Sequence, residues 1–194
     1  MMKKRLLILL AVVCVAALCL CACGGSGDDP TKGGGEQKTI DTGIIATVCP
    51  AGWMYFQQTD MFGETDADGN YPVDPTKMAF IKGGESEWDL FTKPVVYLNY
   101  FEDQITDETI EWAKILMDET TDSTIAVQGT DCKAFTGKSL VESDKDYWEN
   151  TYIFFPAGSG YIQINVPLHC GEAAGVSLDD PDVKAIIDNI KVTK

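Results

Sequence analysis

The sequence has almost no arginine or histidine, two residues that commonly bind nucleic acid or hold metal ions. Arg5 is the only arginine and His169 the only histidine among 194 residues. A protein that neutralises phosphates needs clustered Lys and Arg, whereas this chain has 15 basic residues against 30 acidic ones. Zinc sites need several Cys or His ligands at fixed spacing, and no C-x-x-C motif follows residue 23. We therefore expect no nucleic-acid partner, no metal and no other cofactor.

The sequence also lacks any motif with the spacing of a catalytic site. His169 and Cys170 are neighbours, and neighbouring side chains of an extended chain point to opposite faces, so they are not expected to form a nucleophile and its base. Glu142, Asp144 and Asp146 are candidate glycosidase acids, but a solvated turn between two strands explains this polar run as well. We expect a protein that is not an enzyme. The alternative is a carboxylate-dependent hydrolase that acts on envelope or dietary glycans.

The N-terminal segment has the pattern of a bacterial lipoprotein signal peptide. Three basic residues at positions 3–5 precede an uncharged apolar run over residues 6–20. The tetrapeptide Leu20-Cys21-Ala22-Cys23 then resembles a lipobox, which predicts cleavage after Ala22 and lipid attachment at Cys23. The alternative is an uncleaved transmembrane anchor, which needs about 20 apolar residues; this run is shorter and soon meets two glycines. We expect a protein anchored by lipid on the extracellular face of the cell membrane.

The rest of the chain predicts one acidic domain on a flexible linker. We expect a signal peptide at residues 1–22, the lipidated cysteine with a Gly-rich linker at 23–38, and a single domain at 39–194. About fifteen such linker residues reach roughly 20 Å. Removal of residues 1–22 leaves 12 basic and 30 acidic residues. So acidic a domain is not drawn to anionic lipid, and its expected partner is an unidentified protein, glycan or small molecule.

Alternating apolar residues predict a β-rich domain. Between residues 161 and 166, Ile162, Ile164 and Val166 alternate with polar or aromatic residues, which indicates an antiparallel strand with one apolar face. The turn-rich residues 156–160 and 129–131 predict two hairpins, and residues 60–74 are typical of a loop. The expected strands lie at residues 43–49, 53–57, 78–81, 95–101, 125–128, 132–136, 152–155 and 161–166.

A first helix is expected after Thr106. Its hydroxyl is a suitable N-cap, with Ile105 and Ile110 placed as a hydrophobic staple; the capping box is incomplete because Thr109 stands where Glu is preferred. We expect the buried stripe of this helix to consist of three residues, with Ala113 and Met117 beside them. The three are Trp112, Ile115 and Leu116.

A second helix is expected near the C-terminus. Asp180 is a natural N-cap, and Pro181 suits the first helical turn. Apolar residues then recur at the i, i+3, i+4 and i+7 positions, which gives one buried face. They are Val183, Ile186, Ile187 and Ile190. Strands with helices at two separate points predict the α+β class, a central antiparallel β-sheet flanked by two or more helices.

The order of these features resembles the PsbP-like superfamily. Residues 50–53 have the pattern Pro-x-Gly-Trp, strands and a mid-chain helix follow, and residues 180–190 have the pattern Asp-Pro-Asp-Val-x-x-Ile-Ile-x-x-Ile. Small lipoproteins of Gram-positive bacteria are similar. Over most of residues 40–192, the resemblance implies a central antiparallel sheet between helices. It implies a non-catalytic binding or accessory role and no particular site residue.

Two features leave alternatives open. Cys49, Cys132 and Cys170 remain besides Cys23; outside the cytoplasm two of them could form a disulfide, and three buried reduced thiols are as plausible. Residues 66–70, Asp-Ala-Asp-Gly-Asn, resemble the start of a calcium loop. The glycine is fourth rather than sixth and a lysine stands at position twelve, so a solvated turn is the favoured interpretation.

The tryptophans divide into two groups. Trp53 and Trp112 fit core faces, whereas Trp88 and Trp148 lie in charged surroundings. An exposed tryptophan can contact a sugar or a partner, although more often it caps the edge of a core. The sequence therefore predicts a non-enzymatic extracellular binding or accessory module, recognisable by an exposed apolar patch on an otherwise charged surface.

Overall fold

The computed structural model describes residues 36–143, 146–171 and 173–193. Contacts divide them into two compact units, residues 36–58 with 75–193, and residues 59–74, and each is described by itself. The expected signal peptide, Cys23 and nearly all of the expected linker lie outside the described residues. Within the described ranges, no helix is long and apolar enough to cross a membrane.

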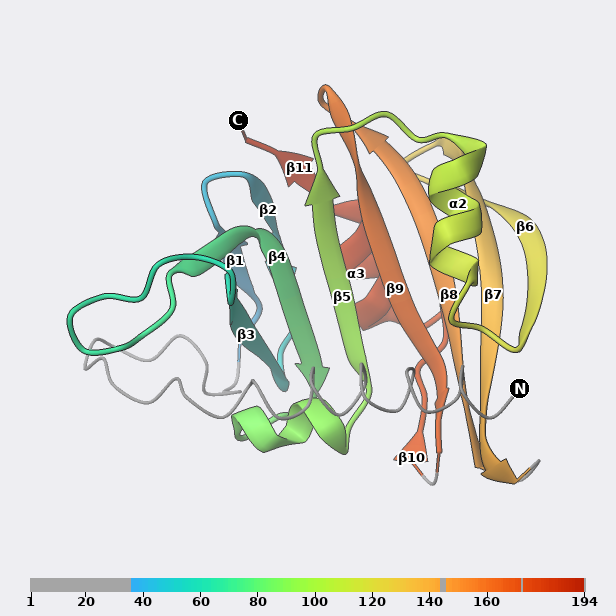
Figure 1. The fold of residues 1–194 in the computed structure, drawn as a ribbon, viewed down its shortest axis with the longest axis horizontal. Coiled ribbons are helices and arrows are strands. Elements are labelled where there is room, and N and C mark those ends of the chain that lie inside the picture. The colour runs from blue at the N-terminus through green and yellow to red at the C-terminus, as the bar shows by residue number, and fades with distance from the viewer. Residues whose placement is uncertain (1–35, 144–145, 172, 194) are drawn as a thin grey trace. The chain divides into compact units, whose positions relative to one another are not determined.

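A long antiparallel sheet forms most of the larger unit (Figure 1). In spatial order its strands are β3 (Trp53–Thr59), β4 (Val73–Lys82), β5 (Val95–Phe101), β9 (Gly160–Cys170), β8 (Asp146–Ala157), β7 (Thr130–Ser143) and β6 (Glu119–Val127), with β10 (Ala173–Ala174) paired to β9. The predicted hairpins are present as β6–β7 and β8–β9. In the first, Gln128 and Gly129 both have positive φ, 50° and 79°, which is the backbone that a tight two-residue hairpin turn requires.

A second, smaller sheet contains strands that the sequence analysis did not predict. β1 (Lys38–Asp41) and the short β11 (Lys191–Val192) both pair with β2 (Ile45–Cys49), so the sheet order is β1-β2-β11. All five residues of β2 are buried. The Thr47 hydroxyl donates a hydrogen bond of 2.5 Å to the carbonyl of Ile186. The first strands of the domain are therefore held by its last residues.

The main core lies on the face of the large sheet that carries α3 (Pro181–Asp188). Alternate residues of β5 and β9 point into it, as their periodicity predicts: Val96, Leu98, Tyr100, Ile162, Ile164 and Val166. α3 adds Val183, Ile186 and Ile187, and Asp180 is its N-cap, as predicted. Trp53 is buried here, and its indole Nε1 donates to Asp182 (3.0 Å).

The opposite face of the sheet carries two smaller apolar clusters. One lies under α2 (Asp107–Lys114) and joins Ile110 to Phe135, Phe154 and Tyr161. The other consists of Met54, Ala79, Ile81 and Val95, with Leu90 of the 3-10 helix η1 (Glu87–Phe91) packed against it. The two α-helices therefore cover opposite faces of the large sheet (Figure 1).

The predicted α+β class holds only in part, because antiparallel sheet dominates the described residues. Their two α-helices have eight residues each, while β7 has 14 residues and β8 has 12. The sequence predicts much shorter strands at 132–136 and 152–155. The extra residues are largely polar, and they pair with the neighbouring strand from Lys138–Glu149 to Ser143–Asp146.

In the smaller unit, residues 60–72 form a loop, as the composition of residues 60–74 predicts, except that Val73 and Asp74 already belong to β4. The Asp60 amide donates to the Pro72 carbonyl (2.8 Å) and closes it. At residues 66–70, one carboxylate oxygen of Asp66 accepts hydrogen bonds from the amides of Asp68 and Asn70, each 2.9 Å long. These bonds form a local turn of the kind that Asp and Asn stabilise.

A candidate binding surface on helix α2

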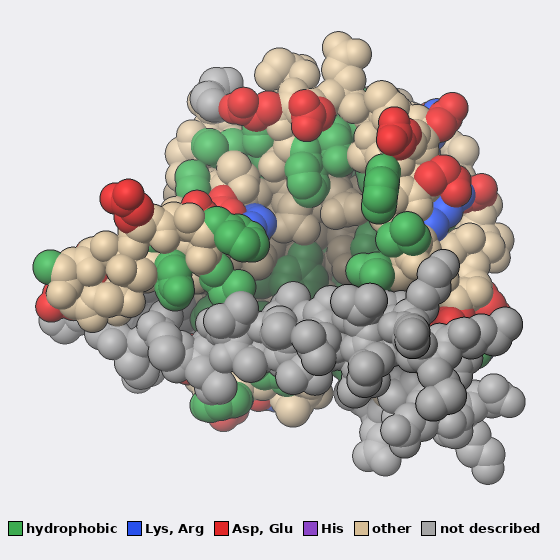
Figure 2. Space-filling model, viewed as in Figure 1, with side chains coloured by type: hydrophobic (Ala, Val, Ile, Leu, Met, Phe, Trp, Pro, Cys, Tyr) green, Lys and Arg blue, Asp and Glu red, His purple; other side chains and the backbone are tan. Residues whose placement is uncertain are grey.

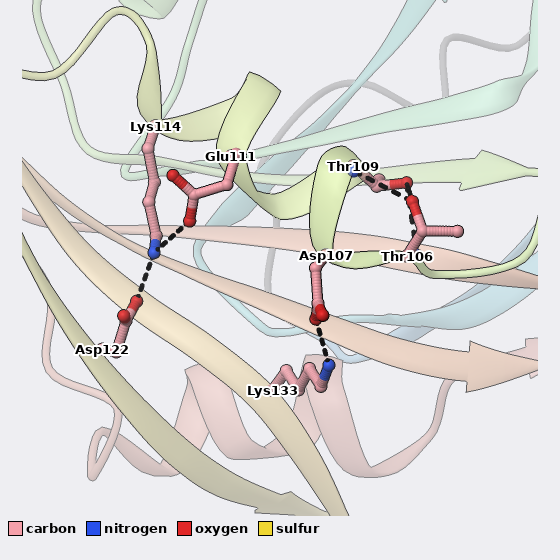
Figure 3. Close-up of polar contacts among 7 residues, drawn as sticks. All are labelled: Thr106, Asp107, Thr109, Glu111, Lys114, Asp122 and Lys133. Atoms are coloured by element: carbon pink, nitrogen blue, oxygen red, sulfur yellow. Dashed lines mark hydrogen bonds and ion pairs between the residues drawn. The ribbon is translucent and has the colours of Figure 1, made fainter.

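Helix α2 begins at a complete capping box. The Thr106 hydroxyl accepts from the Thr109 amide (3.1 Å), and the Thr109 hydroxyl accepts from the Thr106 amide (3.3 Å). The two hydroxyls are 2.9 Å apart (Figure 3). Thr109 therefore replaces the Glu of the usual box, so the sequence-based expectation of an incomplete box was wrong. The cap satisfies two backbone donors at the helix start.

Three ion pairs hold α2, two of them to neighbouring strands (Figure 3). Lys114 Nζ lies 2.6 Å from Asp122 of β6 and 2.9 Å from Glu111 of its own helix. The Lys114 side chain is only 14% exposed, and its hydrogen bonds to Asp122 and then Glu111 raise its pKa. At the other end, Lys133 of β7 lies 2.7 Å from Asp107, and its hydrogen bond lowers the pKa of that carboxyl group. Both ends of the helix are thus tied to the sheet.

Two residues of α2, Ile110 and Ala113, pack on the sheet together with Met117, three residues beyond the end of the helix. Ile110 is buried among three aromatic side chains, and the other two pack against the same cluster. Met117 lies over Gly137 of β7, where an added Cβ would come within 2.7 Å of the Met117 Cγ. The missing side chain at Gly137 therefore makes the space that this register of the helix requires.

The outward face of α2 carries the residues that the sequence predicts to be buried. Trp112 and Ile115 are each 63% exposed and Leu116 is 58% exposed, so that prediction was wrong. α2 ends at Lys114, and its C-cap Ile115 keeps helical φ and ψ, so positions 112 and 115 share one helical face and positions 110 and 113 share another. Residues 110, 113 and 117 pack on the sheet, so residues 112, 115 and 116 point to solvent. We call Trp112, Ile115 and Leu116 the α2 patch.

Acidic residues are close to the α2 patch in the sequence, and one of them contacts it. Glu108 accepts a hydrogen bond of 3.5 Å from the Trp112 indole, and Glu111, Asp118 and Glu119 are exposed nearby in sequence. The two lysines of the ion pairs around α2 are already engaged with carboxylates. Apolar and acidic side chains accordingly lie side by side on this face of the molecule (Figure 2). The surface can receive an apolar side chain flanked by positive charge.

The three cysteines of the described residues are free and buried. Burial raises the pKa of the Cys49 thiol to about 11 and also raises the pKa of Cys132 and Cys170. A thiol with a raised pKa is a poor nucleophile near neutral pH because little thiolate is present. Of the two alternatives left open by the sequence, the structure has the three buried thiols.

His169 lies apart from any nucleophile. Its ring stacks on Tyr147 with centroids 4.1 Å apart, and its strand partner is Glu149. Cys170 follows it on the other face of β9 and pairs with Trp148. The structure therefore brings His169 to an aromatic ring and not to the thiol.

The remaining candidates lie outside the α2 patch. Hydrogen bonds from Asn70 lower the pKa of Asp66, and the described residues contain no group of three or more His, Cys, Asp or Glu placed to hold a metal ion. Trp88 is 57% and Trp148 39% exposed, in accord with their charged surroundings in the sequence. Asp144 and the side chains of Glu142 and Asp146 lie outside the part that the structure describes.

Comparison with known proteins identifies no family. No family model and no curated protein matches the chain. A 1.50 Å crystal structure of a protein from Bacteroides thetaiotaomicron VPI-5482 is similar over 82% of this chain, with 13% identity and a TM-score of 0.44. The chain spans about half, 49%, of the length of that protein.

Proposed function

We propose that the protein is a cell-envelope lipoprotein, tethered through Cys23, that acts as a non-enzymatic extracellular binding or accessory module. The observation that carries this proposal is the α2 patch. It places three large apolar side chains, each more than half exposed, at the C-terminal end of a helix that a cap and ion pairs hold: Trp112 lies in α2, and Ile115 and Leu116 directly follow its last residue, Lys114. Exposed apolar patches with a polar rim are typical of sites where proteins meet.

The partner that fits the α2 patch is a protein segment with an apolar anchor and neighbouring Lys or Arg residues. Tryptophan is enriched among residues that dominate binding energy, and full burial of each aliphatic side chain contributes roughly 1.5–3 kcal/mol. The acidic rim attracts a cationic segment and repels an anionic lipid surface. A second copy of this acidic chain is disfavoured for the same reason.

The test is photo-crosslinking in living cells that make the full-length protein. A photoreactive amino acid replaces Ile115 in the patch and, in a matched control, Lys184 on the exposed side of α3. We expect a discrete crosslinked product from position 115 alone, and we expect it to fade in the double variant Glu108→Lys/Glu111→Lys. Equal products from both positions, no product, or a product indifferent to the charge reversal would contradict the proposal.

The tether has its own test. In the wild-type protein extracted from membranes, mass spectrometry should find a lipid-modified N-terminal Cys23, which the variant Cys23→Ala lacks and the variant Cys21→Ala keeps. An unmodified, full-length N-terminus of the wild type would contradict the anchor.

We also propose that the domain has a PsbP-like arrangement. Support comes from the antiparallel sheet with α2 and α3 on opposite faces, and from the closing helix that begins at Asp180. An experimental structure whose strand order differs from that of the superfamily would contradict this part of the proposal.

A further inference from the structure

Five neutral polar side chains form a strip on the sheet face that carries α2. Tyr97 and Asn99 come from β5, Gln163 and Asn165 from β9, and Tyr152 from β8. Asn99 lies opposite Gln163, and Asn165 lies between Tyr97 and Tyr152. Each alternates along its strand with residues of the main core, so all five point away from that core. All are half-buried. We call this set the amide strip.

The amide strip lies between the two apolar clusters of that face. α2 covers the cluster of Ile110, Phe135, Phe154 and Tyr161, while Leu90 of η1 packs on the other. The strip occupies the central strands between them. Figure 2 shows a hollow on this face, with apolar side chains on either side of it. The strip therefore lies where the sheet is recessed between two covered regions.

The two tyrosines of the strip pack against the apolar clusters, Tyr97 on one and Tyr152 on the other, but packing does not explain the three amides between them. Asparagine is depleted in strands, and an apolar residue would pack better between two apolar clusters. The Asn165 Oδ1 atom is buried and accepts no hydrogen bond from the described residues, although the amide is bonded to Tyr152. Buried polar atoms are normally satisfied, and an unsatisfied one is a candidate contact for water or a ligand.

The side chains of the strip are uncharged, and they can both donate and accept hydrogen bonds. Each amide carries donors and an acceptor, and each tyrosine hydroxyl can do both. None of the five is ionised at neutral pH. At one end, Phe101 stacks on Tyr161 (4.9 Å, 16°), and Phe101 is 39% exposed. That pair follows the Asn99–Gln163 pair along the same two strands. An apolar ring beside amides matches a ligand with hydroxyl groups on its edges and apolar C–H faces.

We propose that the amide strip is a binding site for a neutral oligosaccharide. The hydroxyl groups of the sugar would bond to the amides and tyrosines, and the stacked pair would contact an apolar face of one ring. Acidic glycans are disfavoured because the domain is strongly acidic. The site is separate from the α2 patch, so each proposal stands or fails alone: crosslinking from position 115 does not depend on the amides.

The test is calorimetric titration of the full-length lipoprotein in detergent micelles. Cellotetraose, maltotetraose and chitotetraose are the neutral probes, and tetragalacturonate is the acidic one. We expect saturable binding of at least one neutral probe and none of the acidic one. The double variant Asn99→Ala/Gln163→Ala should bind about tenfold more weakly or worse, since two hydrogen bonds are lost. The control Gln57→Ala, at an exposed amide of β3, should bind as the wild type does.

A near-isosteric variant, Gln163→Glu, keeps the test valid if the double variant fails to fold. It removes donor groups and adds charge, so it should also bind at least about fivefold more weakly while its thermal midpoint remains close to that of the wild type. Absence of binding by every neutral probe would overturn the proposal. So would unchanged affinity in folded Gln163→Glu, or equal binding of tetragalacturonate.

Discussion

Two isoleucine-to-alanine substitutions on α2 separate its two faces. Ile110 is 8% exposed and packs on Phe135, Phe154 and Tyr161. Ile115, one turn further along, is 63% exposed. Both variants remove the same atoms, one within α2 and one at its C-cap, so their difference chiefly reports burial. The sequence pattern places Ile115 in the core, and the structure places Ile110 there.

The magnitudes follow from the burial of each side chain. Ile→Ala in a core costs about 2–5 kcal/mol, and we expect about 3 kcal/mol for Ile110→Ala because a short helix can partly close the cavity. For a domain of this size, about 1 kcal/mol shifts the thermal midpoint by roughly 2–4 °C, so the midpoint should fall by about 6–12 °C. Ile115→Ala should change the stability by no more than about 0.5 kcal/mol.

The assay is urea unfolding followed by circular dichroism, with the denaturant slope m as an internal check. Equal m-values for the two variants and the wild type would show that only stability has changed. A loss for Ile115→Ala as large as that for Ile110→Ala would refute the orientation of α2. The α2 patch would then be part of the core, and the observation that carries the proposed function would be removed.

Three further results are expected. Gly160→Ala should cost about 3 kcal/mol or more, because its Cβ would meet the Phe101 carbonyl oxygen at 1.8 Å. The control Gly129→Ala, at an open turn position with φ of +79°, should cost only about 1–2 kcal/mol. Similar urea midpoints for the two variants would contradict the close approach of β9 to β5. Asp180→Ala should cost about 1–2 kcal/mol at pH 7 through its cap. Because the hydrogen bond from Lys82 lowers the pKa of Asp180 in the folded state, this contribution is present above about pH 4 and fades as the pH falls through the folded pKa. A stability difference between variant and wild type that is undiminished at low pH would contradict this pH dependence. Iodoacetamide at pH 8 should modify Cys49, Cys132 and Cys170 only after unfolding, and mass spectrometry can count the modified thiols. Rapid modification of the native protein would show that the thiols are accessible.

Elements whose burial follows from their own sequence could be predicted. β5 has the bounds that residues 95–101 predict, and α3 begins at its predicted cap, because in both the apolar period and the buried face coincide. β1 and β11 have no such pattern: each is an outer strand of its sheet, and only pairing with β2, from opposite ends of the domain, makes them strands. Backbone pairing between residues far apart in the sequence produces no local alternation of apolar and polar residues from which such a strand could be predicted.

The candidate surface on α2 was missed for a different reason. The segment carries two apolar stripes, and local pattern cannot decide between them. The choice depends on Gly137, which makes room for Met117, and on the ion pair of Lys114 with Asp122. The spacing of residues 110, 113 and 117 also fits one face of a helix, as well as the spacing of residues 112, 115 and 116 does, and it was the signal that pointed to the buried face. The amide strip was visible only as the polar half of an alternating strand.

The position of β2 between β1 and β11 has a consequence for folding during synthesis. A chain that emerges from the ribosome N-terminus first presents β2 before residues 181–192 have emerged. Until then Ile45 and Thr47 lack the partners that bury them in the finished domain, Ile186 and the strand β11. In the emerging chain β2 therefore stays without its full cover until the last residues arrive. A stop codon before α3 would yield a chain whose first strands have no lasting cover, however intact its remaining sheet.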